Sequence, residues 1–178
     1  MRTACTPFPT MDDTRDGMHT SYGTEGLLEA RQLMLAIAGN LSGRSPLIEW
    51  ARELADLHAT LITASVSVTR RPADFDDITT RARIRTVIAL IDEWSARHLP
   101  HPTTGRRHTH SLGEVISHVA DTYAQVQRTL RHTTAAEHQH DAALRFAQVQ
   151  EGYADLIEDI RALRVRLPLG RHSTRPAM

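Results

Sequence analysis

The sequence predicts an all-α fold: an antiparallel bundle of four long helices, preceded by a short N-terminal helix. Apolar residues recur every three or four positions along several long stretches, which is the period of an amphipathic helix. Helix-capping residues stand before those stretches, and most connections between them are short. Aromatic residues make up only 4% of the chain, so the core must be mainly aliphatic. No stretch forms a convincing strand, and we expect no sheet.

The first two helices are predicted in the N-terminal third of the chain. Residues 27–38 are apolar over much of a helical surface, and Gly39-Asn40 should end this short helix because both residues tolerate the left-handed conformation. Ser45 is a good N-cap for the second helix, and Pro46 suits its first position, where a missing N–H costs nothing. Arg70-Arg71-Pro72 should end that helix.

The third helix is predicted to begin at a group of aspartates and to end at Leu99-Pro100. Acidic residues at a helix N-terminus interact favourably with the helix dipole, and here they are Asp74, Asp76 and Asp77. The stripe that should face the core consists of Ile78, Ala82, Ile84 or Arg85, Val87, Ile88, Ile91, Trp94 and His98.

Two capping boxes predict the starts of the fourth and fifth helices. Ser111 and Glu114 have the S-x-x-E spacing, in which each side chain accepts the backbone N–H of the other residue. Thr134 and Glu137 repeat this spacing before the last helix. The segment 168–170, with its proline and glycine, should end that helix.

A chain of 178 residues fits one domain. We expect residues 24–167 to form it, residues 1–23 to be a disordered or loosely attached arm, and residues 168–178 to be a polar tail. The 21 basic and 21 acidic residues cancel, which argues against nucleic acid and an anionic membrane as partners. No apolar run approaches the roughly 20 residues of a membrane span, and no signal peptide is recognisable. With the single cysteine Cys5, we expect a cytoplasmic protein.

One group of motifs resembles a known family. The motifs are Ile91-Asp92-x-Trp94, Leu99-Pro100 and His108-Thr109-x-Ser111-Leu112-Gly113-x-Val115-Ile116. They resemble a family of small helical bacterial proteins that is catalogued as a domain of unknown function and is found mainly in high-GC Gram-positive bacteria. The resemblance would cover about residues 47–167, and it implies a helical fold but no reaction. The chain departs from that family at His110, where an acid is expected, and near Ser117-His118, where an Asp-Arg-like pair is expected.

The histidine-rich loop between the third and fourth helices is the candidate site. It has about a dozen residues, whereas helix connections in bundles usually have roughly 2–8. It also leads into a helix N-terminus, whose free N–H groups favour anions. The candidate ligand-binding residues are Arg107, His108, His110, Ser111 and Glu114.

Two kinds of ligand suit this loop. His108 and His110, with His118 on the following helix, could supply imidazoles to a divalent transition metal. Alternatively, Arg106 and Arg107 could bind an anion at the helix start, although the capping box uses some of the N–H donors there. In a third interpretation the loop has no ligand, its histidines are solvated, and His118 flanks the core.

His58, Arg85 and Asp92 are predicted to be structural polar residues. His58 and Asp92 lie beside apolar stripes on helices that we expect to be neighbours. Since a buried polar group normally has a hydrogen-bond partner, we expect a His58–Asp92 or an Asp92–Arg85 contact inside the bundle. No strand–turn–helix segment presents a nucleophilic serine, which argues against a Ser-His-Asp hydrolase.

These observations leave two functions open. The first is a non-enzymatic module without a cofactor that binds a protein partner or associates with itself. Apolar residues at flanking positions, such as Trp50 and Phe146, leave surface that a second subunit could cover. The alternative is a metal-dependent or phosphate-handling enzyme that uses the loop and the helix start over residues 98–118.

Overall fold

The structure, a computed structural model, describes residues 26–66 and 75–168. Helices account for 73% of these residues, which confirms the predicted all-α class. In chain order the elements are α1 (Ala30–Ile37), α2 (Pro46–Val66), α3 (Asp77–His98), β1 (Arg106–Arg107), α4 (Leu112–His132), α5 (Ala136–Arg161) and β2 (Val165–Arg166). The arm predicted over residues 1–23 and most of the predicted tail lie outside the described residues.

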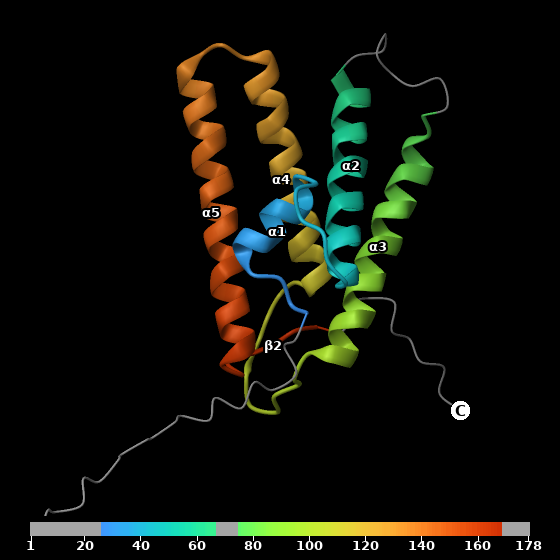
Figure 1. Cartoon of the computed structure of the whole chain (residues 1–178), viewed down its shortest axis with the longest axis vertical. Coiled ribbons are helices and arrows are strands. Elements are labelled where there is room, and N and C mark those ends of the chain that lie inside the picture. Colours follow the sequence, from blue (N-terminus) through green and yellow to red (C-terminus); the bar gives the residue numbers. More distant parts are fainter. Residues whose placement is uncertain (1–25, 67–74, 169–178) are drawn as a thin grey trace, which may run out of the picture.

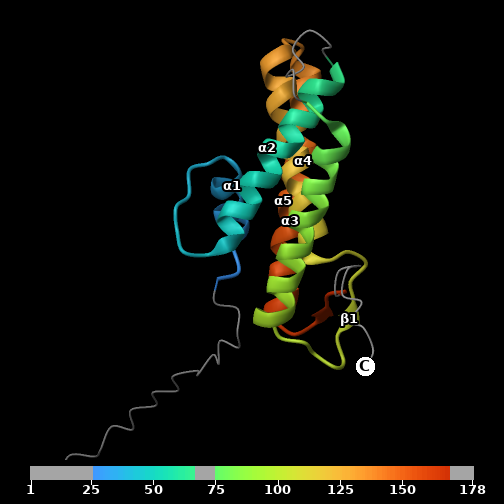
Figure 2. The ribbon, with the colours of Figure 1, turned by 90° about the vertical axis from the view of Figure 1, so that its right-hand side faces the viewer.

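The four long helices alternate in direction along the chain, and the short α1 lies against one face of them (Figure 1; Figure 2). α4 packs against α2, α3 and α5, and α2 also packs against α3. α1 contacts both α2 and α5. None of the helices in the described ranges is long and apolar enough to cross a membrane.

The core is concentrated at one end of the bundle. The largest fully buried side chains include Leu33, Leu47, Leu54, Ile91, Leu112, Ile116, Tyr153 and Ile157. By contrast, none of residues 56–66, 77–83 and 127–152 is buried. We call these three segments, at the top of Figure 1, the free end. The prediction that Ile78 faces the core is wrong, because its side chain is 76% exposed in the free end.

α1 begins later than predicted because Glu29 is its N-cap. The backbone N–H of Glu29 donates to the side chain of Gln32 at 2.9 Å, which completes a capping box. Leu27 and Leu28 precede the helix and are buried in the core. The hydroxyl of Tyr153 in α5 donates a 2.8 Å hydrogen bond to the carbonyl oxygen of Leu28, and burial raises the pKa of that hydroxyl well above its usual value. This bond anchors the segment before α1 to α5.

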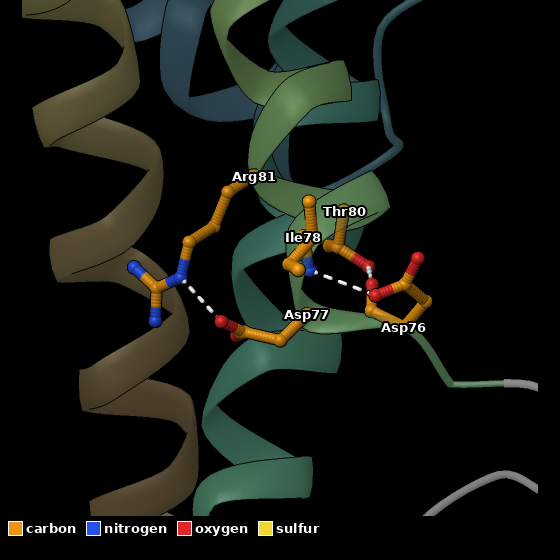
Figure 3. A network of polar contacts seen from close by, with 5 residues as sticks. All are labelled: Asp76, Asp77, Ile78, Thr80 and Arg81. Atoms are coloured by element: carbon orange, nitrogen blue, oxygen red, sulfur yellow. Dashed lines mark hydrogen bonds and ion pairs between the residues drawn. The ribbon is translucent and has the colours of Figure 1, made fainter.

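The start of α3 lies at the predicted aspartates, and one of them, Asp76, is the N-cap. The side chain of Asp76 accepts the backbone N–H of Ile78 at 3.0 Å, and its carbonyl oxygen accepts the hydroxyl of Thr80 at 2.8 Å. Figure 3 shows this network together with the 2.9 Å ion pair between Arg81 and Asp77, which lie one turn apart on α3. The bond to Asp76 satisfies the N–H of Ile78, which has no partner within its own helix.

The capping box predicted for α4 is confirmed, whereas the one predicted for α5 is wrong. The Ser111 hydroxyl accepts the N–H of Glu114 at 3.2 Å, and the Glu114 carboxylate accepts the N–H of Ser111 at 2.9 Å. α5 instead begins after Ala135, which makes no side-chain cap. Thr134 therefore lies one position before the N-cap, and Glu137 is the second helical residue, so the two do not form the box.

α1 and α5 end in the same way, with one residue in the left-handed conformation of a Schellman motif. In α1 that residue is Gly39 (φ 76°), as the sequence predicts. In α5 it is Leu163 (φ 57°), which lies in a conformation that is unfavourable for a residue with a side chain. The closing bonds of α5 are Leu163 N–H to Ile160 O (3.1 Å) and Arg164 N–H to Asp159 O (2.9 Å). The end predicted at 168–170 is therefore wrong, and the chain turns into β2 directly after the helix.

β1 and β2 form a two-stranded parallel sheet, although no sheet is expected from the sequence. Their register places Arg106 opposite Val165 and Arg107 opposite Arg166. Strands of two residues are too short to show an alternating pattern, so they cannot be recognised in a sequence. Gly105 permits the close approach, since a Cβ there would lie 3.2 Å from the backbone that enters β2. The bridge ties the loop between α3 and α4 to the end of α5.

Candidate functional site

The loop histidines form contacts mainly within the loop itself. The rings of His108 and His110 lie with their centroids 6.2 Å apart in an edge-on arrangement. Nδ1 of His108 lies 2.7 Å from the backbone oxygen of His110, and Nδ1 of His110 lies 2.9 Å from the hydroxyl of Thr109. One nitrogen of each ring is therefore engaged by neighbouring residues.

His118 is an exposed residue of α4 and does not join the loop histidines. Within residues 26–66 and 75–168, no group of three or more His, Cys, Asp or Glu side chains is arranged to hold a metal ion. The structure therefore does not bring His108, His110 and His118 together as one metal-binding group.

The start of α4 has few donors left for an anion. Ser111 and Glu114 satisfy each other in the capping box. The N–H of Gly113 has no partner within the helix, but it donates to the side chain of Asp92. Arg107 differs from these residues, because its exposed side chain makes no hydrogen bond or ion pair within the part of the chain that the structure describes. It is the predicted site residue most available to a ligand.

Asp92 joins α3 to α4. It is only 6% exposed, and its Oδ1 accepts the N–H of Gly113 at 2.8 Å. Gly113 makes this approach possible, because a Cβ there would lie 2.5 Å from the carbonyl oxygen of Ile88. The motif residues Asp92, Ser111 and Gly113 thus serve the junction between the two helices.

Both ring nitrogens of His58 contact α4, whereas the predicted contact was with Asp92 of α3. Its Nε2 lies 3.0 Å from the hydroxyl of Ser117, and its Nδ1 lies 3.4 Å from Oδ1 of Asp121. Ser117 and Asp121 are one turn apart on α4 and therefore reach the same side of it. The hydrogen bond from His58 is the main reason that the pKa of Asp121 lies below its usual value.

The order Ser117–His58–Asp121 is that of a hydrolytic triad, with Nε2 facing the hydroxyl and Nδ1 facing the carboxylate. Its surroundings favour a structural role. Ser117 is only 7% exposed, and it lies inside α4, where neighbouring N–H groups are bonded one turn earlier and cannot stabilise an oxyanion. In the sequence, the only sign of this cluster is the i, i+4 spacing of Ser117 and Asp121. That spacing points to His58 only when the packing of α2 against α4 is known.

A shallow cavity of about 450 Å³ lies beside this cluster, between α2 and α3. Its lining includes Leu61, Ile62, Arg81, Arg85 and Asp121. Arg85 is therefore an exposed cavity residue and not the buried structural residue that the sequence suggested.

A larger groove of about 720 Å³ opens in the free end between α2 and α4, next to the C-terminus of α1. Small and aliphatic side chains form much of its lining, among them Ala55, Ala59, Ile62 and Val66 of α2 and Ala124 of α4. Arg128, Arg131 and His132 add positive charge where α4 ends. We call this feature the free-end groove.

No family model, curated protein or solved structure matches the chain. The family resemblance therefore rests on the motifs quoted for it, and the ligand-binding role of the loop stays a prediction.

Proposed function

We propose that this protein is a non-enzymatic helical module that associates with a second copy of itself through the free end. The free-end groove and the uncovered apolar side chains around it carry this proposal. Five large hydrophobic residues are exposed in the described ranges, and all but Leu163 lie in the free end; these are Val66, Ile78, Leu130 and Leu144. A contiguous exposed apolar patch is typical of a protein-interaction site, and we propose that these side chains contribute to one.

These four residues come from four different helices, so the whole end of the bundle is uncovered rather than one flank. Phe146 of α5 is only partly buried there, where its ring packs 5.8 Å from that of Tyr123. A second copy over this end would remove that surface from water, which contributes about 25 cal/mol for each Å² of apolar area.

The charges of the free end favour a second copy as the occupant. Arg128 and Arg131 line the groove, and neither has an acidic partner among the described residues. Glu137 and Asp141 in the first turns of α5 likewise have no cationic partner there. A two-fold arrangement would place α4 of one copy against α5 of the other. The arginines of each copy would then face the acidic residues of its partner, and the symmetry would form this contact twice. The association needs no cofactor, and we place the protein in the cytoplasm.

Sedimentation velocity over a range of protein concentrations tests this proposal. The wild type should shift from monomer to dimer as the concentration rises. Ala59 is exposed in the groove wall, so Ala59→Glu should keep the protein monomeric at concentrations where the wild type is dimeric. The matched control is Thr86→Glu, which introduces the same charge at an exposed position of α3 outside the groove. A monomeric wild type throughout, or an Ala59→Glu variant that dimerises as well as the control, would overturn the proposal.

A further inference from the structure

We propose that Arg107 and Arg166 form a binding site for a phosphate group at the β1–β2 bridge. The bridge lies at the end of the bundle opposite the free end (Figure 1), and the site does not depend on self-association.

The bridge sets these two arginines side by side. They are opposite each other in the parallel register, and the N–H of His108 donates to the carbonyl oxygen of Arg166 at 2.9 Å. Neighbouring strands lie about 4.8 Å apart, and residues opposite each other project from the same face of the sheet. The two guanidinium groups therefore originate at adjacent positions on one face.

The other arginines of the bridge share one acid. Asp159 in the last turn of α5 forms an ion pair with Arg164 at 2.7 Å and a longer one with Arg106 at 3.9 Å. This carboxylate is thus already used by two cations that flank the proposed site.

Arg107 and Arg166 have no carboxylate partner within residues 26–66 and 75–168. Arg166 donates from Nε to the carbonyl oxygen of Gly105 at 3.1 Å, which fixes its direction and leaves its terminal nitrogens available. Like charges directly opposite each other on adjacent strands are unfavourable. An anion bound between the two guanidinium groups would turn this repulsion into two attractive contacts.

The turn that creates this arrangement is itself strained. Leu163 has φ 57°, although residues with a side chain disfavour that region. Residues held in sparsely populated backbone conformations cluster at functional sites. The turn at Leu163 directs the chain from α5 into β2, where Arg166 is in register with Arg107.

Two guanidinium groups recognise an oxyanion through forked, charge-assisted hydrogen bonds. A phosphate monoester carries about two negative charges at neutral pH, so it matches two arginines better than a carboxylate does. The ligand class is therefore inorganic phosphate, pyrophosphate or the terminal group of a phosphate ester.

Isothermal titration calorimetry at physiological ionic strength tests the site. Pyrophosphate, orthophosphate and phenyl phosphate serve as separate probes, so that free anions are distinguished from an ester. One equivalent of the preferred probe should bind the wild type, and Arg107→Gln and Arg166→Gln should each weaken binding by about tenfold or more. The matched control is Arg31→Gln, because Arg31 is an exposed arginine of α1 and does not belong to the bridge, and it should bind as the wild type does.

Arg107→Lys separates forked recognition from general charge attraction. It keeps the charge and loses the fork, so its binding should fall between that of the wild type and that of Arg107→Gln. All of these substitutions alter exposed side chains, and circular dichroism checks that each variant is folded. The proposal is overturned if no probe binds the wild type at millimolar concentration, if Arg107→Gln binds normally, or if Arg31→Gln loses as much affinity.

Discussion

The carboxylate of Asp92 in α3 accepts the backbone N–H of Gly113 in α4 at 2.8 Å, inside the bundle. That N–H belongs to the first turn of α4, where it has no partner in its own helix. The contact thus satisfies a buried donor and places a negative charge at the favourable end of the helix dipole.

Removal of this acceptor should be costly. Asp92→Ala leaves the buried N–H of Gly113 without a partner, and we expect a loss of about 2 kcal/mol in the free energy of unfolding. Asp92→Asn is the control, because its amide oxygen can still accept the bond, and it should lose about half as much. Urea denaturation followed by circular dichroism measures both. Equal losses in the two variants would show that the charge matters and the hydrogen bond does not.

A glycine comparison tests the close approach of α3 and α4. In Gly113→Ala the new Cβ would lie 2.5 Å from the carbonyl oxygen of Ile88, so the helices must separate. We expect a loss of about 1–3 kcal/mol, despite the better helix propensity of alanine. Gly152 in α5 has no atom within 4 Å of a Cβ, and Gly152→Ala should therefore stabilise the protein by up to about 1 kcal/mol. Similar effects at both positions, in thermal or urea unfolding, would contradict the proposed contact.

The two capping positions should respond differently to alanine. Ser111→Ala removes the acceptor for the N–H of Glu114 and should reduce the free energy of unfolding by about 1 kcal/mol. Thr134→Ala should change it by less than about 0.5 kcal/mol, since Ala135 is the N-cap of α5. A loss at Thr134 as large as that at Ser111 would mean that α5 starts earlier than the structure shows.

The pH dependence of Asp121 has a definite sign. Its pKa is lowered in the folded protein, mainly by the hydrogen bond from His58, so the folded state binds fewer protons than the unfolded state in that range. The stabilisation is complete above the unfolded pKa of about 3.9 and is lost as the pH falls through the folded pKa. Asp121→Asn should therefore be less stable than the wild type at about pH 5, by about 1 kcal/mol, and the difference should shrink towards pH 2.5. A difference that grows on acidification would exclude this interpretation.

Local signals in the sequence were sufficient where a helix boundary depends on its own residues. Pro46 at the start of α2, the Ser111–Glu114 box and Gly39 after α1 all lie where the sequence places them. Leu163 shows the limit of such signals. No propensity favours a leucine in the left-handed conformation, and the helix ends there because the following residues pair with the distant β1.

The candidate site was predictable in part for the same reason. The length of the loop drew attention to Arg107, and the structure places that residue at the β1–β2 bridge. Arg166, which lies opposite Arg107 in the bridge, is remote in the sequence, so the sequence alone could not predict that the two residues are neighbours. Likewise, His58 was recognised as a polar residue beside a core stripe, but Ser117 and Asp121 become its partners only through the packing of α2 on α4.

The concentration of buried residues at one end divides the molecule into regions of different local stability. Amide protons of α5 near Tyr153 should exchange with solvent only when the whole protein unfolds, whereas those of residues 136–152 should exchange through cheaper, local opening of the hairpin between α4 and α5. A second copy that covers the free end must leave before this hairpin opens. Exchange rates in residues 136–152 would then fall as the protein concentration rises, while those near Tyr153 would change far less. Amide protons in two parts of α5 would therefore report on association and provide the reference for it.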